Sequence, residues 1–353
     1  MIRVLIVDDS PVAQEFLVHI LTSDPLIRVV GIVANGALAL TAVRDLRPDV
    51  ITMDIHMPHV DGFEATRAIM ESLPTPIVIV SASTSATELA STFKALEAGA
   101  LAVMLRPPGP GHPQYETCAS ELIQTVKLMS EIKLVRRIPR PVSGRPPAPL
   151  PAAAAPKAAT VIRMAAIGAS TGGPPVLQKI LSGLPRDLSA PLLIVQHITP
   201  GFVEGFVDWL GGASGFPVHV AAQGELPLPG HAYVAPDGWH MGVDGGRHIA
   251  LSDHAPENGL RPSVAHLFRS SAQVLGAHAL GVLLTGMGRD GAAELKMMRD
   301  GGAITIAQDA ASSVVHGMPG EAIKLEAATY VLPPEGIAAM LAALLGRTNK
   351  ERA

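Results

Sequence analysis

The sequence predicts an α/β protein built from two doubly wound, parallel-sheet domains, and three observations carry this prediction. In both halves of the chain, short apolar runs alternate with segments of helical periodicity, a pattern typical of parallel strands covered by helices. The length of 353 residues exceeds that of one ordinary domain. A proline- and alanine-rich stretch separates the two alternating regions. We therefore expect a first domain over residues 1–127, a linker over 128–160 and a second domain over 161–348.

Composition excludes several classes of function. Aromatic residues make up 3% of the chain and the formal net charge is −4, so we expect no nucleic-acid partner. The one cysteine, Cys118, excludes an intramolecular disulfide. The first residues, MIRVLIVDDS, reach two carboxylates too early for a signal peptide, and no apolar run approaches the roughly 20 residues needed to cross a bilayer. These features predict a cytoplasmic protein that does not insert into membranes.

Apolar runs bounded by turn residues predict the strands of both domains. Those of the first domain are RVLIVDD, VVGIVAN, DVITMD, PIVIVSAS and AVMLRPP. Those of the second are VIRMAAIGAS, APLLIVQHITP, PVHVAA, HAYVAP, HIALSD, ALGVLLTGMG, AITIAQD and ATYVLPP. Segments such as PVAQEFLVHILTS, PPVLQKILSGL and PSVAHLFRSSAQVLG have helical spacing. Between the domains, residues 133–163 carry basic side chains and no acidic ones, which favours a solvated tether, with docking onto an acidic surface as the alternative.

Acidic residues follow two of the first domain's strands. Asp8 and Asp9 end the first strand and Asp54 ends the third, so the carboxyl edge of the sheet gathers three carboxylates. These would repel one another unless a hard cation neutralised them, and Mg²⁺ with oxygen ligands fits. Ser81 ends the fourth strand and Arg106 the fifth. Together they predict a phosphoryl pocket in which Asp54 is the nucleophile, while Ser81 and Arg106 hold phosphoryl oxygens.

The stretches VDDS, MDIHMPHVDG, VSAS and RPPGP resemble the motifs of response-regulator receiver domains. The resemblance covers nearly all of residues 1–127 and implies a flavodoxin-like fold. One position departs from it, because the family usually has lysine where this chain has Arg106. Arginine keeps the charge but is larger and planar, so we expect an effect on the speed of phosphorylation or on its coupling to the switch. An inactive receiver is the alternative.

A serine in the second domain lies in a nucleophile frame. Residues 168–172, GASTG, match G-x-S-x-G, with a predicted strand before Ser170 and a predicted helix after it. A phosphate-binding P-loop is excluded because no Gly-Lys-[Ser/Thr] follows, and a dinucleotide loop would need glycine at position 170. The alternative on spacing alone is a serine that only caps the helix.

Two further residues complete a predicted catalytic triad. His197 follows the apolar run LLIVQ one strand later, and Asp290 follows the buried run that ends in TGMGRD. We expect Ser170 to be the nucleophile, His197 the general base and then acid, and Asp290 the group that orients the imidazole; Asp309, which also follows a strand, is a less constrained alternative acid. Backbone N–H groups in the turns at Thr171 and Met287 are the candidates for an oxyanion hole.

Residues 161–348 resemble the catalytic domain of chemotaxis protein-glutamate methylesterases. The matching stretches are IGASTGG, VQHITPGF, YVAPDGWHM, RPSVAHLF, LLTGMGRDGA and AQDAASSVVHGMPGEAI, in the family's order. The resemblance implies a Rossmann-like fold without a cofactor, the triad named above and the Met287 N–H as an oxyanion donor. It also implies hydrolysis of γ-glutamyl methyl esters, and deamidation of glutamines, on the cytoplasmic helices of chemoreceptors.

Three positions depart from that family's usual pattern. Gly320 replaces a basic residue, Ala265 an acidic one and Leu260 a histidine. We expect none of them to touch the triad, and we expect any effect to fall on recognition of the receptor surface.

The two resemblances together imply regulation of the esterase by phosphorylation. In the family the unphosphorylated receiver packs over the esterase cleft. A chemotaxis-type histidine kinase would phosphorylate Asp54, biasing a switch surface at Ser81 and at a fifth-strand position, here Val103 or its neighbour, that is normally aromatic. A scaffold protein without turnover is one alternative. A transcription regulator is disfavoured because no basic recognition helix follows the linker.

Overall fold

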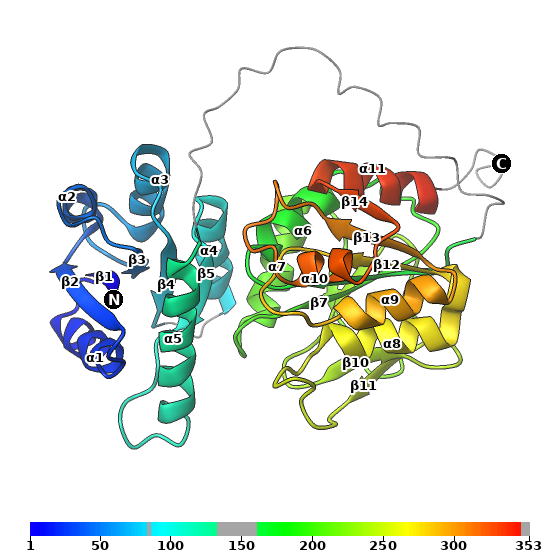
Figure 1. The fold of residues 1–353 in the computed structure, drawn as a ribbon, viewed down its shortest axis with the longest axis horizontal. Helices are drawn as coiled ribbons and strands as arrows, with labels where there is room; N and C mark the ends of the chain where they lie inside the picture. Colours follow the sequence, from blue (N-terminus) through cyan, green and yellow to red (C-terminus); the bar gives the residue numbers. More distant parts are fainter. Residues whose placement is uncertain (83–85, 133–160, 347–353) are drawn as a thin grey trace, which may run out of the picture.

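The computed structural model describes residues 1–82, 86–132 and 161–346 (Figure 1). The predicted linker from residue 133 onward and the last two residues of the predicted second domain lie outside the described residues. Within the described part of the chain, no helix combines the length and the apolar character that crossing a membrane requires.

The first half folds as one parallel sheet with helices around it. Within residues 1–82 and 86–132 the strand order is β2-β1-β3-β4-β5, and every pair is parallel, which is the flavodoxin-like order. All five strands coincide with the apolar runs predicted from the sequence. The strands are β1 (Ile2–Val7), β2 (Ile27–Val33), β3 (Val50–Met53), β4 (Ile77–Ser81) and β5 (Ala102–Leu105). The helices are α1 (Pro11–Thr22), α2 (Gly36–Leu46), α3 (Gly62–Ser72), α4 (Ala86–Glu97) and α5 (Tyr115–Ser130).

Local sequence explains where the first three helices start. Ser10, Asn35 and Asp61 precede α1, α2 and α3, and each side chain accepts a hydrogen bond from a backbone N–H of the first turn. Such caps satisfy donors that the helix itself leaves without partners. Each helix therefore begins directly after the loop at the carboxyl end of its strand, which keeps that edge of the sheet available for functional side chains.

The second half contains a larger parallel sheet. Within residues 161–346 the order is β14-β13-β12-β6-β7-β9-β8, and all pairs in this sheet are parallel. Its strands are β6 (Met164–Ala169), β7 (Leu192–Gln196), β8 (Val218–Val220), β9 (Ala232–Val234), β12 (Ala279–Leu283), β13 (Ile304–Gln308) and β14 (Tyr330–Leu332). The α-helices are α6 (Gly173–Ser182), α7 (Val203–Ser214), α8 (Val264–Leu275), α9 (Ala292–Asp300), α10 (Met318–Lys324) and α11 (Pro334–Leu345).

A short antiparallel pair adds to the predicted parallel architecture. Strand β10 (His240–Val243) pairs with β11 (Ile249–Ser252) outside the large sheet. The sequence predicted the second of these strands but not the first, because the short run HMGV contains only two large apolar residues. This pair packs against α8 and places His240 in a buried position beneath the start of that helix.

The order of the large sheet creates a crevice at its centre. From β6 the chain continues to β7 on one side, whereas from β12 it continues to β13 on the other. Because the connections leave the adjacent strands β6 and β12 in opposite directions, their carboxyl ends border an opening, which is the usual ligand site of such sheets. Ser170 follows β6 and Asp290 follows β12, so both predicted residues lie at this switch point.

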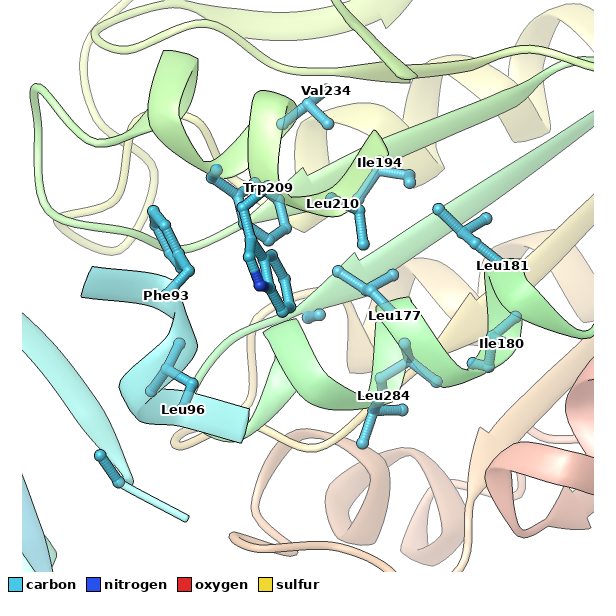
Figure 2. Close-up of a cluster of buried hydrophobic side chains, with 14 of the residues drawn as sticks. Phe93, Leu96, Leu177, Ile180, Leu181, Ile194, Trp209, Leu210, Val234 and Leu284 are labelled. Atoms are coloured by element: carbon cyan, nitrogen blue, oxygen red, sulfur yellow. The ribbon is translucent and has the colours of Figure 1, made fainter. Parts of the chain in front are cut away.

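The two halves share a buried apolar cluster. Phe93 and Leu96 of α4 belong to the same cluster as Leu177 of α6 and Phe206 of α7. Figure 2 shows Phe93 and Leu96 facing Trp209 of α7 and Leu177. The contact between the halves is therefore a packed helix–helix interface rather than a loose approach of two surfaces.

Candidate functional site

The three predicted triad residues lie at the carboxyl ends of three neighbouring strands. Strands β6 and β7 pair in a register that sets Ala169 opposite Gln196, and the His197 N–H donates to the Ala169 carbonyl at 2.9 Å. Ser170 and His197, each one residue farther along, are therefore held side by side. Asp290 reaches the same point from the loop after β12, which pairs with β6 on its other edge.

His197 and Asp290 form a close pair. The His197 Nε2 atom lies 2.9 Å from Asp290 Oδ2, and the side chains are only 11% and 3% exposed. Because Nε2 faces the carboxylate, Nδ1 is the ring nitrogen that Asp290 leaves available to a second partner. A buried carboxylate on one ring nitrogen holds the tautomer in which the other nitrogen can accept a proton.

The first turn of α8 anchors the carboxylate. The Val264 N–H donates to Asp290 Oδ2 at 2.6 Å, and the Ala265 N–H donates to Oδ1 at 3.1 Å. Both donors belong to a helix N-terminus, whose partial positive charge favours a carboxylate there. The expectation that Ala265 does not touch the triad is therefore wrong, since its main chain, which any residue would supply, binds Asp290.

Two glycines let α8 come this close. A Cβ atom on Gly168 would lie 2.3 Å from Val264 Cγ1, and one on Gly291, whose φ is +78°, would lie 2.4 Å from the same atom. Neither distance is sterically possible, so both positions need glycine for the helix to reach Asp290. Sequence reasoning missed the two amide donors; the available signal was Ser263, the cap residue directly before the helical run.

Gln196 links the nucleophile to the base. Its side chain is 3% exposed, and Nε2 donates to the carbonyls of Ser170 at 2.9 Å and His197 at 2.8 Å. Its Oε1 atom is buried without a hydrogen-bond partner among the described residues. The oxygen lies close to Gly173 at the start of α6, where the next two residues are prolines and supply no N–H. One side-chain amide thus ties together the two backbone segments that carry Ser170 and His197, a role the sequence did not reveal.

The Thr171 turn is held by the hydroxyl group of Thr285, which lies two residues before Met287. Thr285 Oγ1 donates to the Thr171 carbonyl at 2.9 Å and accepts from the Val315 N–H at 3.0 Å. Within the described residues, no acceptor receives the N–H of Thr171 or of Met287. Both amides remain available to an oxygen atom, as an oxyanion donor must be.

A cavity of about 360 Å³ opens onto the predicted nucleophile. Ser170, Thr171 and His197 line it from the second half, and Phe93, Leu96 and β5 residues that include Val103 line it from the first. Leu260, one of the three departures from the family pattern, also borders this cavity. Ser170 therefore lies in a cavity whose walls come from both halves of the chain.

The three acidic residues of the first half lie close together, as the sequence predicted. Carboxylate oxygens of Asp8, Asp9 and Asp54 all lie within 4.8 Å of one another, and Asp8 and Asp54 are buried. Burial raises the pKa of Asp54 above its ordinary value, and the neighbouring charge of Asp8 raises it further. Burial also raises the pKa of Asp8. The site is thus short of positive charge.

Arg106 adds one positive charge to this cluster, and its guanidinium group contacts Asp8. Its Nη2 atom lies 2.8 Å from Asp8 Oδ2, and its backbone N–H donates to the Ser81 carbonyl at 2.7 Å. The guanidinium group is thus held on a carboxylate of the acidic cluster. Three carboxylates against one guanidinium leave an excess of negative charge and several free oxygen ligands, a donor set that fits Mg²⁺.

Comparisons with known proteins agree with this geometry. Residues 165–341 match the CheB methylesterase family, and residues 4–111 match the response regulator receiver domain. The chain belongs to the CheB methylesterase family. This confirms the family resemblance and the two parallel-sheet α/β halves predicted from the sequence.

Individual relatives cover the whole chain. A protein-glutamate methylesterase/protein-glutamine glutaminase from Nitrosospira multiformis is 55% identical over 100% of this chain and 99% of its own length. One from Syntrophus aciditrophicus is 57% identical over 98% of this chain and 99% of its own length. The crystal structure of the Thermotoga maritima CheB methylesterase catalytic domain is 35% identical, with a TM-score of 0.50, and covers 52% of this chain and 99% of that one.

Proposed function

We propose that this protein is a serine hydrolase that removes methyl esters from glutamate side chains of chemoreceptors, deamidates receptor glutamines, and is activated by phosphorylation of Asp54. The observation that carries the proposal is the His197–Asp290 pair beside Ser170, in a cavity whose other wall is the receiver. We also propose that the protein acts in the cytoplasm, with receptor helices as its substrates and a chemotaxis-type histidine kinase as phosphodonor.

The chemistry follows from the positions of the side chains. His197 Nδ1 takes the proton of the Ser170 hydroxyl as Oγ attacks the γ-carbonyl carbon of the substrate. The N–H groups of Thr171 and Met287 stabilise the oxyanion that forms. As the C–O bond of the ester breaks, protonated His197 gives its proton to the leaving methoxide, and methanol departs. Water then attacks the acyl-enzyme with His197 as base, which restores Ser170 and releases the glutamate; an amide substrate releases ammonia by the same steps.

The receiver supplies control. Asp8, Asp9 and Asp54 would hold Mg²⁺, which when bound neutralises negative charge on the phosphoryl group. A carboxylate oxygen of Asp54 attacks the phosphorus atom while the bond from phosphorus to the histidine nitrogen of the kinase breaks, and that histidine leaves. The Ser81 hydroxyl and the Arg106 guanidinium contact the phosphoryl oxygens during this transfer. Phosphorylation then shifts the population toward a form in which the receiver no longer covers the cavity at Ser170. In this proposal the triad does not change chemically; only access to it does.

Methanol release from methylated receptor membranes tests the proposal. We expect release by the full-length protein to rise with a small-molecule phosphodonor and Mg²⁺. The rise should disappear in Asp54→Ala, and all release should disappear in Ser170→Ala. Release that needs Ser170 but ignores the phosphodonor would refute the regulatory half of the proposal. No release, combined with no labelling of Ser170 by a fluorophosphonate, would favour a scaffold protein instead.

A further inference from the structure

The surface that the receiver covers has the properties of a binding site for a helix. Phe93 of α4 is 1% exposed, and its ring lies among those of Phe202, Phe206 and Trp209, at centroid distances of 6.2, 5.5 and 5.6 Å. The rings of Phe93 and Trp209 are stacked, and Figure 2 shows the two side chains facing each other. When α4 departs, this aromatic face of α7 loses its cover, and a patch of this kind commonly marks a protein-interaction site.

The same contact includes an acidic group. Glu97, four residues after Phe93 and therefore on the same side of α4, accepts a hydrogen bond from Trp209 Nε1 at 3.0 Å through Oε1. Trp209 is 6% exposed, so its N–H donor sits at the edge of a largely desolvated patch. An indole N–H in such a place selects an oxygen acceptor on the helix that packs over it.

The helix in this position also borders the catalytic cavity. Phe93 and Leu96 line the space onto which Ser170 and His197 open. A helix seated on α7 in the manner of α4 therefore presents side chains both to the aromatic face and to the nucleophile. A glutamyl ester on a substrate helix needs this arrangement. The backbone of the helix stays outside the cavity, and the esterified side chain extends into the cavity to reach Ser170.

We propose that the aromatic face of α7, formed by Phe206, Trp209 and the N-cap residue Phe202, is the docking site for the substrate helix of the receptor, and that α4 occupies it as a substrate mimic. The proposal rests on the proposed function above. The partner is an amphipathic helix with an apolar residue at position i that packs on the three rings. A carboxylate or amide at i+4 accepts from the Trp209 N–H, as Glu97 does. The receiver then inhibits the enzyme in two ways: α4 competes with the receptor helix for the aromatic face of α7, and the receiver obstructs the cavity at Ser170.

Two substitutions, one at each end of the hydrogen bond between Trp209 and Glu97, distinguish competition for the α7 surface from simple obstruction of the cavity. Trp209→Phe keeps an aromatic ring but removes the donor, whereas Glu97→Ala removes the acceptor on the receiver side. Both weaken the closed form, so both should raise methanol release without phosphodonor by about threefold to tenfold. With saturating phosphodonor and Mg²⁺, Trp209→Phe should lower kcat/KM on receptor membranes by about threefold to tenfold, mainly through KM, whereas Glu97→Ala should match the wild type.

The outcomes separate cleanly. Equal activated kcat/KM in the wild type, Trp209→Phe and Glu97→Ala would overturn the proposal, since α7 would then be only a seat for the receiver. Fluorophosphonate labelling of Ser170 in the activated state shows whether the loss in Trp209→Phe is confined to the receptor substrate. Absence of methanol release in the activated wild type would count against the proposed function itself and not against the docking site alone.

A second measurement does not depend on the folding of any variant. A helix-stapled peptide of residues 86–99 is added to the wild-type, full-length protein with phosphodonor present. We expect it to raise KM for receptor membranes without changing kcat, and we expect the same peptide with Glu97→Ala to require about threefold to tenfold more for an equal effect. No change in KM with either peptide would overturn the substrate-mimic proposal.

Discussion

Replacing Phe93 by alanine should activate the enzyme without phosphorylation. Phe93 is the receiver residue whose ring enters the aromatic cluster of α7, and it is 1% exposed. The change removes ring contacts between α4 and α7, and it alters no side chain of the proposed triad. The equilibrium between closed and open forms should therefore move toward the open form.

The size of the shift follows from the contacts. Each aromatic pair contributes about 0.5–1.5 kcal/mol beyond the burial of area, and Phe93 makes three such pairs with α7. Truncating a fully buried phenylalanine to alanine costs about 3–5 kcal/mol, but part of that cost falls on the receiver's own packing. We assign about 2 kcal/mol to the contact between the halves. At about 1.4 kcal/mol for each factor of ten, the equilibrium shifts by about 30-fold.

The assay is methanol release from methylated receptor membranes without phosphodonor. We expect Phe93→Ala to raise the rate by up to about 30-fold, with the activated wild-type rate as the ceiling, and to reduce the further stimulation by phosphodonor. Phe16→Ala is the matched control, because Phe16 pairs with Tyr115 at 6.1 Å between α1 and α5 of the receiver. A basal rate in Phe93→Ala no higher than in Phe16→Ala would refute the reasoning.

Three other predictions concern the sites themselves. Gln196→Glu replaces the side-chain N–H donor that the Ser170 and His197 carbonyls share with an oxygen acceptor. We expect kcat to fall about 100-fold while KM changes little, because the two residues lose their relative position. Steady-state rates equal to those of the wild type would exclude a positioning role for Gln196. Arg106→Ala removes the positive charge that contacts Asp8, so we expect a metal titration to show several-fold tighter binding of Mg²⁺. We expect phosphorylation of Asp54, measured by consumption of the phosphodonor, to become slower. Weaker binding of Mg²⁺ would contradict this reasoning. Burial lowers the pKa of His316 below its ordinary 6.5, so the folded form resists protonation, and the free energy of unfolding should fall as pH drops below 6.5. Chemical denaturation of wild type and His316→Gln between pH 7 and 5 checks this, because the variant should lose that part of the pH dependence.

Much of the candidate site could be predicted because it depends on strand ends. Ser170, His197 and Asp290 each follow a buried apolar run, and the carboxyl ends of adjacent parallel strands meet at one edge. The same rule placed Asp8, Asp9 and Asp54 together. In these cases a local pattern, read with one topological rule, was enough.

Other features could not be predicted because they depend on contacts between distant segments. The amides of Val264 and Ala265 reach Asp290 only because Gly168 and Gly291 admit the start of α8. Nothing local to Gln196 indicates that its side chain would bond to two carbonyls, one of them 26 residues earlier in the chain. The strand β10 was missed because its four residues carry too little of an alternating pattern.

The sequence by itself determined the two α/β halves, their order, and the residue types at each strand end, because hydrophobic periodicity and short motifs are properties of neighbouring residues. Only the tertiary structure decided that Arg106 is held on Asp8, that Phe93 lies among the rings of α7 and that Glu97 meets Trp209. These pairs are separated by long stretches of chain, and each forms only when two independently patterned elements pack together. The physical reason is that burial and hydrogen bonding depend on which groups lie close together in space. For residues far apart in the chain, only the complete fold determines that proximity.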